Sequence, residues 1–237
     1  MNLRSKTMQD VTIECCANSI SSALTGIKAG ANRIELCKNL ENGGETPNRA
    51  DILKLRQLTD KKIHVLVLPK ANNFIYTKTE ENQILKDILF CKKNKINGVV
   101  IGALNTDNSI NVKQMLKFID AARPMNVTFH RAFDTLKETE ENLKKIIRCK
   151  CDYLLTSGQE KNVDLGLKNI SKILEQVNHK IKIITGGGVN VKNVENLYKL
   201  GIREFHLSGT NKKKAKPLET NYKLIKEVVD KLKQIKK

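Results

Sequence analysis

The residues best suited to chemistry lie at alternate positions in four short β-rich segments. Successive side chains of a strand point to opposite faces, so alternate positions share one face. The residues on this shared face are Thr12, Glu14, Cys16, Arg33, Glu35, Cys37, Thr128, His130, Glu204, His206 and Ser208. Buried charge is costly unless it is paired. A face this polar therefore indicates either a functional site or a structural ion-pair network.

Carboxyl and imidazole groups on this face are candidates for proton transfer. Glu14, Glu35 and His130 are candidate general acids or bases, and Arg131 is suited to stabilising negative charge. The same groups have structural explanations, because Glu14 and Glu35 could pair with Arg33, and a single histidine is often a satisfied core residue. Residue types alone leave both interpretations open.

Two thiols of the shared face, those of Cys16 and Cys37, end neighbouring strands, whereas Cys15 points to the opposite face. Adjacent strands lie about 4.8 Å apart, so both thiols could reach one soft metal ion. Thiolates suit Cu(I) better than Mg²⁺ or Ca²⁺. Buried cysteine is usually inert packing, so that alternative also stays open. The six cysteines form no C-x-x-C pair, which argues against a zinc ribbon or a redox motif.

The elements that must position these residues alternate along the whole chain. The hydrophobic period switches between two and about 3.6 at intervals of roughly 25 to 30 residues. The expected strands are Val11–Cys16, Arg33–Cys37, Ile63–Leu68, Gly98–Ile101, Val127–His130, Tyr153–Thr156, Lys182–Thr185 and Glu204–Leu207. The expected helices are Ser19–Ala29, Arg49–Leu58, Thr79–Asn94, Val112–Ala122, Thr139–Arg148, Val163–Asn178, Val191–Leu200 and Asn221–Ile235. Asn111 and Asn190 are candidate N-caps, and Gly201 follows the seventh helix.

Eight strand–helix units without a linker predict an α/β protein, a TIM (β/α)8 barrel that forms one domain over residues 1–237. An open doubly wound sheet would more often carry a glycine-rich turn after its first strand, where this chain has Cys16-Ala17-Asn18-Ser19. Barrel active sites lie at the carboxyl ends of the strands, where the polar residues of the shared face are placed.

Segments after the later strands offer donors for an anion. Gly186, Gly187 and Gly188 end the seventh strand, and their backbone N–H groups could face an anion at the start of the next helix. Ser208 follows the eighth strand, while Ser157 and Gln159 follow the sixth. Loops seven and eight commonly hold a phosphate in barrels. A tight connection without a ligand is the alternative.

The composition is that of a soluble globular protein, with 40% hydrophobic and 29% charged residues. No run of about 18 apolar residues predicts a membrane span, and the first nine residues lack the apolar stretch of a secretory signal. We therefore expect a cytoplasmic protein. The net charge of +18 comes mainly from lysine, and the densest basic run, Lys212–Lys216, has no aromatic neighbour. This pattern predicts a solvated basic surface and not a nucleic-acid interface.

Several motifs together resemble the CutC family, the copper homeostasis proteins. The match extends from about residue 11 to residue 210. In chain order, the matching segments are Glu14-Cys15-Cys16-Ala17-Asn18-Ser19, Asn32-Arg33-Ile34-Glu35-Leu36-Cys37, Gly43-Gly44-Glu45-Thr46-Pro47, Gly98-Val99-Val100-Ile101-Gly102-Ala103-Leu104, Thr128-Phe129-His130-Arg131-Ala132-Phe133-Asp134, Leu155-Thr156-Ser157-Gly158-Gln159, Gly186-Gly187-Gly188-Val189 and Glu204-Phe205-His206.

The resemblance implies a cytosolic TIM-barrel protein linked to copper tolerance, oligomeric with a homodimer favoured. It also implies Cu(I) binding through Cys16 and Cys37 at the carboxyl-end mouth of the barrel. The polar face favours an alternative, a barrel enzyme of lyase, isomerase or hydrolase type acting on a small anionic or phosphorylated substrate. His206 would then join the anion-binding residues, and whether the protein is an enzyme stays open.

One segment departs from the family pattern. After the third strand the family usually has Arg-Pro-Arg and then Gly-Gly-Asp-Phe, whereas this chain has Leu68-Pro69-Lys70-Ala71-Asn72-Asn73-Phe74. Leu68 thus replaces the first arginine, whose side chain points inward. Lys70 replaces the second arginine and lacks its bidentate guanidinium group. If that arginine holds an anion in relatives, we expect weaker or different anion binding here. The loop, with Phe74 and Tyr76, is long enough to act as a lid.

Overall fold

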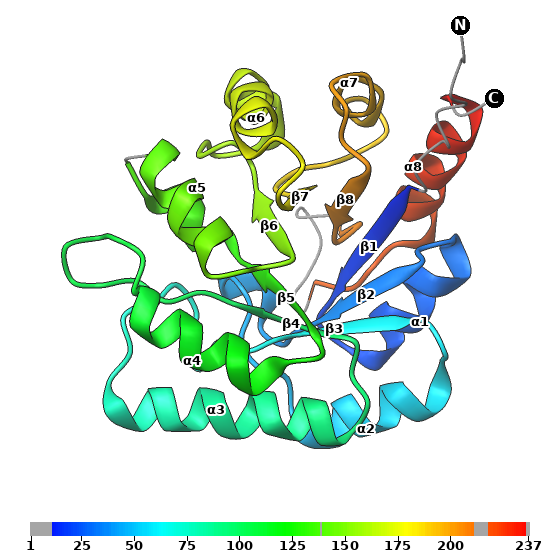
Figure 1. The fold of residues 1–237 in the computed structure, drawn as a ribbon. Helices are drawn as coiled ribbons and strands as arrows, with labels where there is room; N and C mark the ends of the chain where they lie inside the picture. The colour runs from blue at the N-terminus through cyan, green and yellow to red at the C-terminus, as the bar shows by residue number, and fades with distance from the viewer. Residues whose placement is uncertain (1–10, 138, 211–217, 236–237) are drawn as a thin grey trace, which may run out of the picture.

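The computed structural model describes residues 11–137, 139–210 and 218–235, and its strands form one closed parallel barrel (Figure 1). The order around the barrel follows the order along the chain, and β8 closes the barrel against β1. The predicted TIM barrel is therefore confirmed. The strands are β1 (Thr12–Ala17), β2 (Arg33–Leu36), β3 (Lys62–Leu66), β4 (Gly98–Ile101), β5 (Asn126–Phe129), β6 (Tyr153–Thr156), β7 (Lys182–Thr185) and β8 (Glu204–Leu207).

Helices follow the strands and cover the outside of the barrel (Figure 1). They are α1 (Ile20–Ala29), α2 (Arg49–Leu58), α3 (Lys78–Lys93), α4 (Val112–Ala122), α5 (Thr139–Arg148), α6 (Val163–Val177), α7 (Val194–Lys199) and α8 (Tyr222–Ile235). Two short 3₁₀ helices, η1 (Leu40–Asn42) and η2 (Arg131–Thr135), have no counterpart in the hydrophobic pattern, because one turn is too short to show a period.

The seventh helix begins three residues later than its pattern predicts. Asn111 caps α4 as expected, accepting a hydrogen bond from the Gln114 amide. Asn190 does not cap α7, because its side-chain oxygen accepts from the Lys192 amide inside a turn that precedes the helix. Gly201 follows α7 with a φ of 107°, as its position at the helix end requires.

The hydrophobic core lies between the strands and the helices. Outward residues of the strands, such as Ile34, Phe129 and Phe205, are fully buried in it. Cys15 is also part of this core, and α1 approaches it closely, since a Cβ on Gly26 would lie 2.5 Å from the Cys15 Sγ. The alternation predicted for the strands therefore holds, and the polar residues of the shared face point into the barrel.

No helix among the described residues is both long and apolar enough to cross a membrane. The first nine residues and the basic run Lys212–Lys216 lie outside the described residues. The structure therefore does not test what the sequence predicts for these two segments.

Candidate functional site

An ion-pair network fills the barrel interior beneath the site. Arg33 of β2 is almost completely buried, and its Nε donates to Glu14 of β1. Its Nη1 lies 2.9 Å from a carboxylate oxygen of Glu204 of β8. The guanidinium also lies 5.0 Å from the ring centre of Tyr153, a cation–π distance. Arg33 thus links the first two strands to the last one.

Glu14 connects this network to His206. The register of the parallel strands places the two residues side by side on β1 and β8, and the His206 Nδ1 lies 2.8 Å from the Glu14 Oε1. Burial opposes ionisation of Glu14, but the Arg33 charge and the His206 hydrogen bond outweigh it and hold its pKa well below its usual range. Both carboxylate oxygens of Glu14 are therefore engaged.

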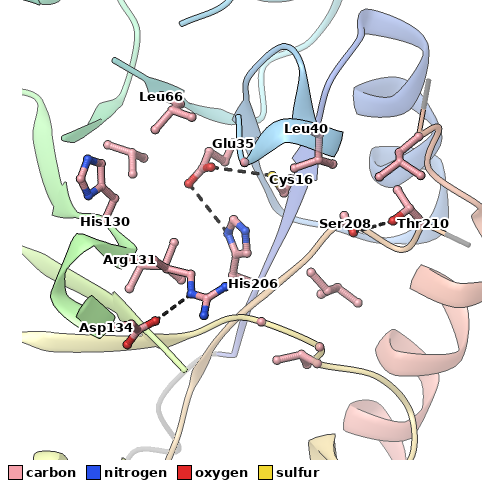
Figure 2. Close-up of a pocket in the computed structure, with 18 of the residues that line it drawn as sticks. Cys16, Glu35, Leu40, Leu66, His130, Arg131, Asp134, His206, Ser208 and Thr210 are labelled. Atoms are coloured by element: carbon pink, nitrogen blue, oxygen red, sulfur yellow. Dashed lines mark hydrogen bonds and ion pairs between the residues drawn. The ribbon is translucent and has the colours of Figure 1, made fainter. Parts of the chain in front are cut away.

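Potential metal ligands converge above Glu14. One donor atom from each of Cys16, Glu35 and His206 lies within 4.8 Å of the other two, and all three residues are buried (Figure 2). The Sγ atoms of Cys16 and Cys37 are 3.9 Å apart. Cys37 directly follows β2 and has its side chain on the same face as Glu35. The structure therefore brings the two predicted thiols together and adds a carboxylate and an imidazole to them.

Ionisation in this cluster is strongly shifted. Burial raises the pKa of Glu35 to about 7, and the charge of Glu14 acts in the same direction. The contact with Cys37, together with burial, raises the pKa of the Cys16 thiol well above its usual value. Burial disfavours the charged form of His206, but the carboxylate of Glu35 and the neighbouring Cys16 outweigh it and raise the pKa of His206. Without a metal, the thiol of Cys16 is therefore protonated at neutral pH.

A cavity of 970 Å³ opens at this end of the barrel, and the cluster forms part of its lining. Apolar residues of the wall include Leu66, Leu68, Phe74, Val100 and Leu155. The polar part includes Cys16, Glu35, His130, Arg131, His206 and Ser208. Glu14 is not among the lining residues, so of the two candidate carboxylates Glu35 is the one that a bound molecule can contact.

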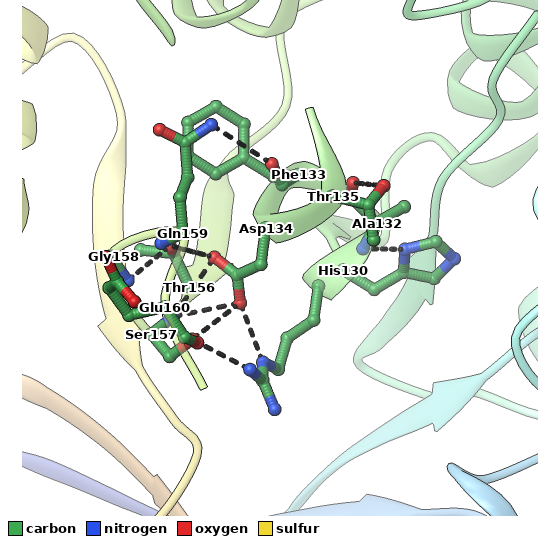
Figure 3. A network of polar contacts seen from close by, with 11 residues as sticks. His130, Ala132, Phe133, Asp134, Thr135, Thr156, Ser157, Gly158, Gln159 and Glu160 are labelled. Atoms are coloured by element: carbon green, nitrogen blue, oxygen red, sulfur yellow. Dashed lines mark hydrogen bonds and ion pairs between the residues drawn. The ribbon is translucent and has the colours of Figure 1, made fainter. Parts of the chain in front are cut away.

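Arg131, in η2, is held at the cavity by a polar network (Figure 3). Its Nε donates to Asp134 and its Nη2 donates to the Ser157 hydroxyl, both over 2.7 Å. Asp134 accepts further hydrogen bonds from the backbone amides of Ser157 and Gln159 and from the Thr156 hydroxyl. Asp134 was not among the predicted site residues, although its i,i+3 spacing from Arg131 is compatible with an ion pair.

His130 is buried beside this network and is neutral. Its Nδ1 accepts a hydrogen bond from the Ala132 amide, so the proton of the neutral ring is on Nε2. Burial lowers the pKa of His130 to about 4. A Cβ on Gly102 would lie 2.5 Å from its Cε1, and the Phe74 ring centre lies 4.9 Å from that of the imidazole.

The residues predicted to bind an anion fall into two groups. Gln159, Gly187, Gly188, His206 and Ser208 line the cavity. Gly186 and Ser157 are not part of the lining, and Ser157 instead joins Arg131 to Asp134. The helix predicted to begin at Val191, just after the three glycines, begins only at Val194. These glycines therefore do not form a helix N-terminus.

A model of the CutC family matches residues 11–211. The chain belongs to the CutC family. It is 38% identical to the CutC family protein of Bacteroides fragilis over 203 residues, or 85% of this chain and 81% of that protein. It is also 38% identical to the CutC protein of Parabacteroides distasonis, over 83% and 82% of the two chains. The solved structure of the putative copper homeostasis protein CutC from Streptococcus agalactiae has a TM-score of 0.79 and 25% identity, and covers 84% of this chain and 98% of that one.

The segment that departs from the usual CutC pattern forms a wall of the cavity. Leu68 is buried and packs with Leu66 and Val100 beside the two cysteines. The loop after it is tied to the barrel, because the Leu104 amide donates to the Phe74 carbonyl and the Tyr76 hydroxyl donates to the Gly102 carbonyl, each over 2.8 Å. At the Leu68 position the cavity wall is therefore hydrocarbon.

Proposed function

We propose that the protein serves copper homeostasis by binding Cu(I) between Cys16 and Cys37 at the carboxyl-end mouth of the barrel. The observation that carries this proposal is the 3.9 Å separation of the two Sγ atoms beside the cavity. Thiolates are the ligands that Cu(I) prefers, and two of them this close can hold one ion. The similarity to the putative copper homeostasis protein CutC of Streptococcus agalactiae supports the same function.

His206 is suited to be a third ligand. Its Nδ1–H points to Glu14, which leaves Nε2 as the coordinating atom. Metal-ligating histidines commonly donate their other N–H to a carboxylate, which fixes the ring and raises its basicity. Glu35 contributes a hard oxygen and is less suited to Cu(I), so its role in this site is to supply negative charge beside His206.

Six free and buried cysteines fit a reducing compartment, and we infer that the protein works in the cytoplasm. The homodimer implied by the family resemblance stays a prediction. Neither inference is needed for the copper site, because all its donors come from one chain.

The test is an anaerobic competition titration of Cu(I) against a chromophoric chelator. We expect the Cys16→Ala/Cys37→Ala variant to bind Cu(I) at least 100-fold more weakly than the wild type. The matched control is Cys91→Ala/Cys149→Ala, which removes two other buried cysteines and leaves the affinity unchanged. X-ray absorption of the copper-loaded protein should show two sulfur donors. Equal affinities of the wild type and the Cys16→Ala/Cys37→Ala variant would overturn the proposal.

A further inference from the structure

The cavity has room for much more than a metal ion. Its 970 Å³ lies at the upper end of the range of small-molecule pockets, which is roughly 300 to 1,000 Å³. Of the proposed copper site, Cys16, Glu35 and His206 line this cavity, and Figure 2 shows His130 and Arg131 to the other side of Glu35 from Cys16. The copper site therefore leaves most of the cavity without a function.

Arg131 is presented to this space in a fixed orientation. Its Nε and Nη2 are engaged by Asp134 and Ser157, which leaves Nη1 as the nitrogen without a partner among the described residues. The side chain is 40% exposed and lines the cavity. A guanidinium oriented in this way by its other hydrogen bonds binds a carboxylate or phosphate oxygen with little loss of entropy.

His130 supplies a second and independent indication of a ligand. The residue is only 5% exposed and lines the cavity, yet its Nε2 has no hydrogen-bond partner among the described residues. Because Nδ1 accepts from Ala132, Nε2 carries a proton. A buried donor without an acceptor is costly, and a ligand oxygen would remove that cost.

The glycine segment allows close approach of the backbone. Gly187 and Gly188 have φ angles of 101° and 94°, and their N–H groups have no acceptor among the described residues. A Cβ on Gly187 would lie 3.2 Å from the Arg131 guanidinium carbon. Glycine at this position therefore keeps the space beside the guanidinium open.

Part of the cavity wall near these donors is hydrocarbon. Leu66, Leu68 and Val100 form a buried apolar cluster that lines the cavity. A ligand that fills the site must therefore combine a charged end with an apolar body. A free inorganic ion would satisfy only the donors.

We propose that this cavity binds a small organic anion, with a carboxylate or phosphate held by Arg131, a second oxygen held by His130 and a carbon body packed on Leu66, Leu68 and Val100. The proposal goes beyond copper binding and does not depend on it. It fits the expectation of an anionic substrate but assigns the anion to Arg131 and not to a helix N-terminus.

The test is calorimetric titration of the full chain with a panel of small anions at 0.15 M salt. Glycerol 3-phosphate represents the phosphate esters, L-lactate the carboxylates, and inorganic phosphate the anion without a carbon body. We expect saturable binding of at least one of the two organic anions, and tighter binding than that of inorganic phosphate. The relative affinities of glycerol 3-phosphate and L-lactate distinguish the two anionic groups.

Arg131→Gln should weaken this binding at least tenfold, and His130→Leu should weaken it several-fold. Asp134 keeps the hydrogen bonds from Ser157, Gln159 and Thr156 when Arg131 is replaced, so the variant should stay folded, which circular dichroism checks. The matched control is Arg49→Gln, because Arg49 is 50% exposed and pairs with Asp87 but does not line the cavity.

The Cys16→Ala/Cys37→Ala variant separates the two proposals, since it should lose copper binding and keep anion binding. Absence of saturable binding of both organic anions to the wild type would overturn the anion site without touching the copper site. Equal affinities of Arg131→Gln and the wild type for the organic anions would also overturn the anion site.

Discussion

The Nδ1 of His206 lies 2.8 Å from the Oε1 of Glu14, although 192 residues separate them in the chain. The contact forms because β8 closes the barrel against β1 in a register that pairs these two residues. Glu14 meets Arg33 through its other oxygen and does not line the cavity, so its direct contact with the proposed metal ligands is the one with His206. Glu14 is therefore a positioning residue in the proposed copper site.

Glu14→Gln should weaken Cu(I) binding about 10- to 100-fold, which is the usual effect of losing a carboxylate behind a ligating histidine. The same competition titration measures it. Glu204→Gln is the control, because it also removes a charged partner of Arg33 but does not contact His206. If both variants lose the same affinity, the contact between Glu14 and His206 has no specific role.

The buried His130 should make the protein less stable in mild acid. Its pKa is lowered from 6.5 to about 4, so the unfolded chain takes up a proton before the folded protein does. Stability is therefore lost as the pH falls from 6.5 to 4, by roughly 3 kcal/mol at pH 4 for this one residue. Urea unfolding at several pH values measures the loss.

His130→Gln should flatten this pH dependence, since the residue that titrates is removed. His64, which is also buried and has a pKa lowered to about 4, keeps its own contribution in both proteins. The comparison therefore isolates His130. An identical slope of stability against pH in the two proteins would contradict the burial argument.

Gly166 of α6 should be intolerant of alanine. A Cβ there would lie 1.8 Å from the carbonyl oxygen of Ser157, in the segment that holds Asp134. Alanine normally favours a helix by up to about 1 kcal/mol, but the clash should reverse the sign and cost about 2 kcal/mol or more. Thermal unfolding of the Gly166→Ala variant measures this loss of stability. Gly201→Ala is the control, because a Cβ there meets nothing within 4 Å and only its φ of 107° is strained.

Asp134→Asn should destabilise the fold and loosen Arg131. An amide nitrogen would face groups that donate to the carboxylate, including the backbone amides of Ser157 and Gln159. Leaving such buried donors without an acceptor costs roughly 1 to 3 kcal/mol. Asp87→Asn is the control, since among the described residues the Asp87 carboxylate accepts hydrogen bonds only from the side chains of Arg49 and Gln83. Equal unfolding midpoints for the two variants would contradict the role of Asp134.

The barrel and the inward face could be predicted because both follow from periodicity. Alternation along β1 and β2 was enough to place Cys16, Glu35 and Cys37 inside and Cys15 outside. The contact between Glu14 and His206 depends on how the sheet closes, which no local pattern contains. Asp134 was missed because a single 3₁₀ turn has no period to detect. The start of α7 was misplaced because the residues after Asn190 favour a turn as well as a helix.

The order of the proposed metal ligands along the chain has a consequence for protein synthesis. Cys16 and Cys37 leave the ribosome early, whereas His206 and the strand that carries it come among the last elements. Until β8 takes its place against β1, the nascent chain has two thiols but neither the imidazole nor the closed barrel that shields them. Completion of the proposed copper site would therefore coincide with completion of the fold, because a chain interrupted before β8 lacks His206.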